Sequence, residues 1–136
     1  MKKLYALLNV SAQFQRRSFF SAWVLYGTIL LIGSVPGARA EVAQVASGLV
    51  LHMAAYSVLT MLLFVGVRGT PAWRGAKAFL WVVAMGAGDE WVQHFWPYRS
   101  GTLTDWAIDG LASALTAVAL WGICSTLSAT EGAASR

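Results

Sequence analysis

The sequence predicts an all-α integral membrane protein, with four transmembrane helices in an antiparallel bundle and both termini in the cytoplasm. Of its 136 residues, 57% are hydrophobic and only 12% are charged, which lies well outside the range of soluble domains. The apolar residues come in long blocks rather than at the periods of amphipathic helices or strands. The basic residues stand at the ends of these blocks, and their placement sets the orientation.

The chain begins with a basic segment, residues 1–17, which we expect to lie in the cytoplasm, in part on the membrane surface as a short amphipathic helix. The first span follows at about residues 18–36. A twin-arginine signal peptide is the alternative here, because Arg16 and Arg17 precede an apolar run that ends near Ala38-Arg39-Ala40. We favour an uncleaved span, since the run of about 17 residues exceeds the ~7–15 of a usual signal core.

Three further apolar blocks lie at about residues 47–67, 76–96 and 103–127. Each is long enough to cross about 30 Å of hydrocarbon at about 1.5 Å per residue. Proline and glycine mark the connections between the blocks. Residues 18–127 therefore form one transmembrane domain, and residues 128–136 form a small polar tail that we expect to be mobile.

Basic residues gather on one side of the predicted bundle. They precede the first span or lie between the second and third: Lys2, Lys3, Arg16, Arg17, Arg68, Arg74 and Lys77. The other two connections hold only Arg39 and Arg99. The positive-inside rule then places both termini in the cytoplasm. In this orientation the end of the third span and the beginnings of the second and fourth meet at the outer face.

Composition excludes several functions. The net charge is +4, but the basic residues form no stripe with interleaved aromatics, so nucleic-acid binding is not expected. Cys124 is the only cysteine, which rules out a disulfide framework, and we expect it to pack as a small apolar residue. We expect no cofactor. Glu90 and His94 have a two-ligand helical spacing for a metal, but no second histidine stands on that helix, so a metal is not favoured.

Polar residues mark one face on each of three predicted spans. They recur at helical spacings of three or four residues: His52 and Tyr56 on the second span, Asp89, Glu90, Gln93 and His94 on the third, and Asp105 and Asp109 on the fourth. An ionisable group in a bilayer costs about 2.5–3.5 kcal/mol at a helix centre. The acids are therefore expected to pair with Arg99, His94 or His52, or to face water in an outward-facing polar pocket.

Simpler interpretations remain open for these residues. Asp89 and Glu90 also suit the solvated end of a span, and Asp105 suits the start of a helix, where an acid is favoured by the macrodipole. His52 and Tyr56 also suit a contact between helices. Arg99 also suits an ordinary loop position, although it is one of two outer basic residues beside several acids. Asp109 lies deeper in its span and is harder to explain structurally.

The same residues resemble a known family. The pattern comprises Asp89-Glu90-x-x-Gln93-x-x-x-Pro97-x-Arg99, Asp105-x-x-x-Asp109, His52-x-x-x-Tyr56 and Ser34-Val35-Pro36-Gly37. Together they resemble the VanZ-like family of small bacterial membrane proteins over about residues 23–122. The chain departs from the family at Leu49, where members often carry lysine, and at Asp109, where asparagine is frequent.

The resemblance implies a multi-pass protein of the bacterial inner membrane, with membrane lipid as its surroundings. The family takes its name from resistance to the glycopeptide teicoplanin. We expect a non-enzymatic protein that binds a cell-envelope ligand, such as a cell-wall lipid headgroup or a glycopeptide-related molecule, with Gln93 and Arg99 as contacts. The alternative is an enzyme acting on a lipid-linked headgroup, with Glu90 or Asp105 as general acid or base. A proton-coupled carrier is less favoured, because no polar stripe continues to the cytoplasmic side.

Overall fold

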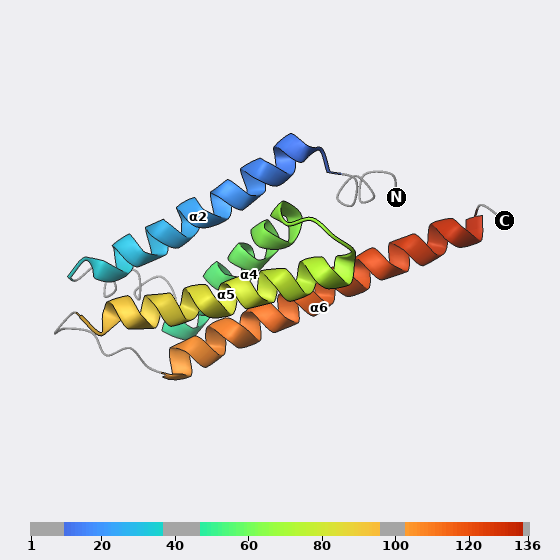
Figure 1. Cartoon of the computed structure of the whole chain (residues 1–136). Coiled ribbons are helices and arrows are strands. Elements are labelled where there is room, and N and C mark those ends of the chain that lie inside the picture. Colours follow the sequence, from blue (N-terminus) through green and yellow to red (C-terminus); the bar gives the residue numbers. More distant parts are fainter. Residues whose placement is uncertain (1–9, 37–46, 96–102, 135–136) are drawn as a thin grey trace.

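The computed structural model describes residues 10–36, 47–95 and 103–134, and this part of the chain folds into four helices without a strand. The helices are α2 (Ala12–Ser34), α4 (Gly48–Gly66), α5 (Pro71–Gln93) and α6 (Leu103–Ala134). Successive helices run in opposite directions (Figure 1). The predicted all-α class is confirmed. Two helices, α4 and the segment Leu103–Thr130 of α6, are long and apolar enough to cross a membrane.

Local side-chain chemistry explains where three of the helices begin. The hydroxyls of Ser11, Ser47 and Thr70 each accept a bond from a backbone N–H three residues later, at 3.3–3.4 Å. Such caps satisfy donors that the first helical turn leaves without partners. Pro71 then occupies the first turn of α5, where its missing N–H does no harm. As a result, α2 and α5 begin several residues before the predicted positions 18 and 76.

Helix α6 also ends later than predicted, at Ala134 rather than near residue 127. The hydroxyls of Ser128 and Thr130 donate to the carbonyls of Cys124 and Thr126, each at 2.9 Å. These bonds satisfy the two hydroxyls within the helix, so polar residues are accommodated in its last turns. Residues 128–134, expected as a tail, are helical in this structure.

The core forms around α4, which contacts each of the other three helices. Its buried residues Leu59, Leu63 and Phe64 pack with Ala78 and Val82 of α5. Helix α2 lies mainly against α4, and α5 lies along α6 (Figure 1). The polar faces of α4, α5 and α6 meet at the interface of these three helices.

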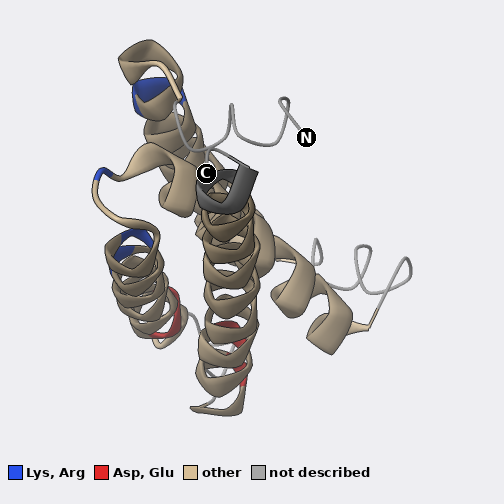
Figure 2. Ribbon diagram, turned by 90° about the vertical axis from the view of Figure 1, so that its right-hand side faces the viewer, with Lys and Arg blue, Asp and Glu red and all other residues tan. Residues whose placement is uncertain are grey.

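Charge is segregated along the bundle. Lys and Arg gather toward one end, and the acids of α5 and of the first half of α6 lie toward the other (Figure 2). The basic end contains the start of α2 and the connection between α4 and α5. The acidic end contains the end of α5 and the start of α6, with Asp89, Glu90, Asp105 and Asp109. The topology brings together acids that are up to 20 residues apart in the sequence.

Candidate functional site

Three helices each contribute polar side chains from positions four residues apart, and these side chains are buried at the interface of the three helices. They are His52, Tyr56 and Thr60 of α4, Asp89 and Gln93 of α5, and Asp109 and Ser113 of α6. A spacing of four residues places side chains on one helical face. All of them except His52, which is half-buried, are at most 3% exposed. We call these seven residues the polar cluster.

A contact between two ionisable side chains joins α4 to α6. His52 Nδ1 lies 2.9 Å from Asp109 Oδ1, and Asp109 is fully buried. Burial strengthens such a bond because little water competes with it. This contact fixes the orientation of the imidazole, and when Asp109 is ionised its carboxylate accepts the Nδ1–H of the ring.

Tyr56 connects this pair to α5. Its ring stacks on that of His52, with centroids 6.0 Å apart and planes 4° apart. Its hydroxyl donates to Asp89 Oδ2 at 3.4 Å, which is long for a bond between oxygens. One face of α4 thus contacts an acid of α5 and an acid of α6.

The cluster ends deeper in the bundle at a pair of hydroxyls. Thr60 Oγ1 donates to the Tyr56 carbonyl at 2.7 Å and lies 2.9 Å from Ser113 Oγ. Both residues are fully buried. From this level toward the basic end, the buried residues of α4 and α5 are Leu63, Phe64, Ala78 and other apolar or small side chains as far as Arg74.

A glycine lets α6 approach α5 beside Asp109. A Cβ at Gly86 would lie 3.0 Å from Trp106 Cδ1 and 3.3 Å from Asp109 Oδ2, which is too close for an unshifted neighbour. The Trp106 Nε1–H donates to the Val83 carbonyl at 3.0 Å and fixes the same crossing. The lack of a side chain at Gly86 therefore permits this close approach of α6 to α5.

Some polar atoms of the cluster are buried without a hydrogen-bond partner in the described structure. They are Nε2 and Oε1 of Gln93 and Oδ2 of Asp109. Gln93 is 2% exposed and follows Asp89 by one helical turn. A buried polar group without a partner costs about 1–3 kcal/mol. The cluster therefore presents one amide donor, one amide acceptor and one carboxylate acceptor that no described residue uses.

The remaining predicted residues lie around the cluster or outside the description. Glu90 and Asp105 are half-buried at the same end of the bundle. His94 is exposed and caps α5, with its N–H donating to the Glu90 carbonyl at 3.1 Å. Arg99 lies outside the described residues. Within residues 10–36, 47–95 and 103–134, no three His, Cys, Asp or Glu side chains gather in a way that could hold a metal ion.

Sequence reasoning did not include three of the contributing residues in the site. Thr60 and Ser113 continue the four-residue spacings of Tyr56 and Asp109, so this periodicity was the signal for both. Tyr26 of α2 gave no such signal, because it stands alone in an apolar block. Its hydroxyl donates to the Met85 carbonyl at 2.9 Å and attaches α2 to the helix that carries Asp89.

Arg74 differs most from its expected setting. It was counted with the charges of a connection, but it lies in the first turns of α5 and is 3% exposed. Its Nε donates to the Phe64 carbonyl at 2.7 Å, and its guanidinium carbon lies 4.6 Å from the centre of the Phe64 ring. The aromatic ring and the free carbonyl at the end of α4 together accommodate the buried cation.

Comparisons of the chain with protein-family models, with curated proteins and with solved structures each return no match. Inferences about function therefore depend on the residues and geometry of this chain.

Proposed function

We propose that this chain is a four-span protein of the bacterial inner membrane, of the VanZ-like type, with both termini in the cytoplasm. Exposed large apolar side chains on every helix support a lipid environment, among them Leu31 of α2, Val50 of α4, Leu80 of α5 and Leu115 of α6, each more than half exposed. Such broad apolar exposure is unusual for a soluble monomer. Only 28% of the apolar window of α4 and of α6 is buried, which also argues against soluble core helices.

The lengths and charges of the helices are consistent with this arrangement. Helices α2 and α5 contain 23 residues each, or about 34 Å at ~1.5 Å per residue, enough to cross the hydrocarbon. The cations gather at the end of the bundle that the positive-inside rule assigns to the cytoplasm. The polar cluster then belongs to the outer half of the membrane.

The proposed function is to bind a cell-envelope ligand at the polar cluster. The observation that carries this proposal is the buried Gln93 amide, one helical turn from Asp89, which has no hydrogen-bond partner among the described residues; Asp109 Oδ2 on α6 has none among them either. A primary amide offers both a donor and an acceptor and so can form two hydrogen bonds with another amide, and a carboxylate accepts from an N–H or an ammonium. The described groups therefore favour an amide-bearing ligand, such as the peptide portion of a cell-wall lipid precursor or of a glycopeptide. Recognition of an anionic headgroup would depend on Arg99.

One observation favours an enzyme as the second candidate. The His52–Asp109 pair has the arrangement in which a carboxylate orients an imidazole for general acid or base work. Such an enzyme would act on a lipid-linked headgroup. Turnover of a lipid-linked peptide by the wild type, abolished in Asp109→Asn, would favour the enzyme over the binding protein.

Ligand-induced stabilisation tests the binding proposal. The purified protein in detergent would be heated with a muramyl peptide, a lipid-linked muropeptide or teicoplanin, and with zwitterionic phosphatidylcholine as a ligand that lacks an amide. An amide-bearing ligand at a hundredfold excess over its Kd should stabilise the wild type by about 2.7 kcal/mol. Gln93→Leu should bind that ligand about tenfold more weakly, because it loses the amide contacts.

Gln13→Leu is the matched control, because Gln13 is an exposed glutamine near the start of α2. It should respond like the wild type. The proposal is wrong if no amide-bearing ligand stabilises the wild type, or if Gln93→Leu and Gln13→Leu respond equally.

A further inference from the structure

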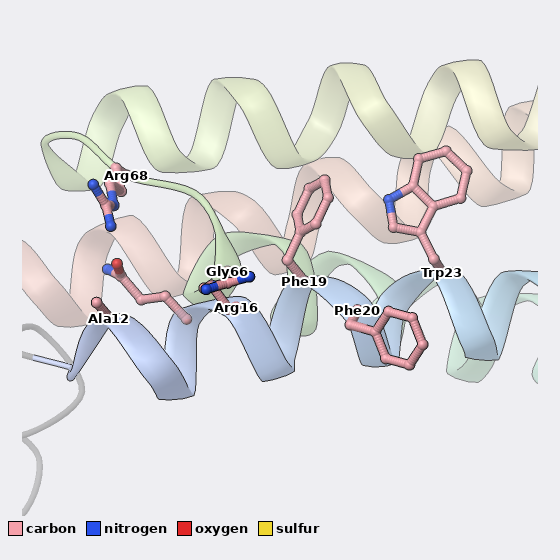
Figure 3. Close-up of a pocket in the computed structure, with 8 residues that line it drawn as sticks. Ala12, Arg16, Phe19, Phe20, Trp23, Gly66 and Arg68 are labelled. Atoms are coloured by element: carbon pink, nitrogen blue, oxygen red, sulfur yellow. The ribbon is translucent and has the colours of Figure 1, made fainter.

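A groove of about 410 Å³ lies at the basic end of the bundle, far from the polar cluster. Its walls come from the first half of α2 and from the connection between α4 and α5. The residues that define it are Arg16, Phe19, Phe20, Trp23, Gly66 and Arg68. Figure 3 shows Arg68 and Arg16 toward one end of the groove and the aromatic rings toward the other. The groove is thus charged at one end and apolar at the other.

The shape of the groove depends on Gly66, the last residue of α4. A Cβ at this position would lie 2.7 Å from the backbone nitrogen of Phe19 and 2.9 Å from its Cβ. The backbones of α2 and α4 are therefore in direct contact here, and the residues of this contact, Gly66 and Phe19, line the groove. The chain then turns at Gly69, whose φ of 135° is one that side-chain-bearing residues rarely adopt. Lys77 Nζ donates to the Arg68 carbonyl at 3.0 Å and holds the connection in place.

The two arginines carry charge that the described protein does not neutralise. Both Arg16 and Arg68 are exposed, and neither forms an ion pair with any acid in the described helices. The acids of α5 and of the first half of α6 lie at the opposite end of the bundle (Figure 2). Two guanidinium groups that reach one groove from separate elements are suited to a phosphate, which accepts several N–H bonds at once.

The apolar part continues from Arg16 along one side of α2. Phe20 and Trp23 follow Arg16 by four and seven residues, which places all three on the same helical face. Phe20 is 69% exposed and Trp23 is 40% exposed. The line of side chains runs from charge at the end of the bundle to aromatic surface nearer its middle. This order matches the order of headgroup and acyl chain in one leaflet of a bilayer.

We propose that this groove binds an anionic phospholipid, with its phosphate at Arg16 and Arg68 and an acyl chain along Phe20 and Trp23. The site is separate from the polar cluster and shares with the proposed function only the premise that the chain lies in a bilayer. An anionic phospholipid supplies both the charge and the chain that the groove accommodates, whereas a free phosphate supplies only the charge. The ligand class is therefore phosphatidylglycerol or another lipid of the same charge.

Native mass spectrometry of the protein in detergent tests this site, with phosphatidylglycerol and with zwitterionic phosphatidylethanolamine as probes. The wild type should retain phosphatidylglycerol preferentially. A basic residue near a charged membrane surface contributes about 1 kcal/mol, so Arg16→Gln and Arg68→Gln should each weaken retention about fivefold. The matched control is Arg17→Gln, since Arg17 is exposed on the same helix but does not line the groove. It should retain the lipid like the wild type.

Two further experiments distinguish a phospholipid from a free phosphate as the ligand of the groove. Glycerol 3-phosphate, which has the headgroup charge but no chain, should bind far more weakly than the lipid, and Phe20→Ala should weaken lipid retention. The proposal is overturned if Arg16→Gln and Arg17→Gln retain equal amounts of lipid, if both phospholipids are retained equally, or if glycerol 3-phosphate binds as well as the lipid. Gln93→Leu should retain phosphatidylglycerol normally. Failure of the polar cluster to bind its ligand would leave this result unchanged.

Discussion

Replacing Gln93 with leucine is expected to stabilise the unliganded protein while weakening its binding of an amide-bearing ligand. Gln93 is 2% exposed, and neither Nε2 nor Oε1 has a hydrogen-bond partner in the described structure. Burying a polar group without a partner costs about 1–3 kcal/mol. Leucine has a similar volume and no polar side-chain atom, so the substitution removes this cost without opening a large cavity.

The expected gain is about 2 kcal/mol in the free energy of unfolding, the middle of that range. For a chain of this length it corresponds to a rise of roughly 8 °C in the thermal midpoint. The seven tryptophans allow unfolding in detergent to be followed by intrinsic fluorescence. Gln13→Leu, at an exposed position, should change stability by less than about 0.5 kcal/mol.

A fall in the midpoint of Gln93→Leu would refute the reasoning. It would mean that the amide stabilises the unliganded protein, and that Gln93 is a structural residue rather than a group kept for a ligand. A rise in the midpoint together with undiminished ligand binding would also separate Gln93 from the proposed site.

Two further predictions concern contacts between helices, each measured by chemical denaturation in detergent. His52→Ala and Asp109→Asn should each destabilise the protein by about 3–5 kcal/mol, because each leaves a buried partner uncompensated. The double variant should show a coupling energy of about 1–3 kcal/mol between the two sites. Additive effects of the two substitutions would contradict the pairing. Gly66→Ala should cost about 1–3 kcal/mol, because its Cβ would lie 2.7 Å from the Phe19 nitrogen. Gly122→Ala should instead stabilise the protein by up to about 1 kcal/mol through helix propensity, because a Cβ at Gly122 would have no atom within 4 Å. Similar effects at both glycines would contradict the close contact at Gly66.

The order of the helices could be predicted from the sequence because apolar blocks and breakers are local signals. Their ends could not be predicted as well. Thr70 and Pro71 begin α5 before its apolar block, and Ser128 and Thr130 extend α6 beyond its own. Capping and back-bonding by short polar side chains decide these positions, and hydrophobic content does not report them.

The sequence predicted which face of each helix carries the polar residues of the candidate site. Spacings of four residues placed His52 with Tyr56 and Asp89 with Gln93 on single sides of their helices. The same spacing extended to Thr60 and Ser113, although the prediction did not include them. The resemblance to the VanZ-like family drew on these same positions and remains a prediction.

By itself the sequence determined four helices, their alternating direction, three polar faces and a separation of basic from acidic ends, because each of these follows from local composition and chain order. Only the tertiary structure decided which partners meet. It paired Asp109 with His52, where Arg99 and His94 were equally plausible, and it buried Arg74 against Phe64. The rotation and crossing of helices select such contacts. At Gly86 and Gly66 the helices can cross this closely only because glycine has no Cβ. The residue opposite each glycine decides how severely a Cβ would clash.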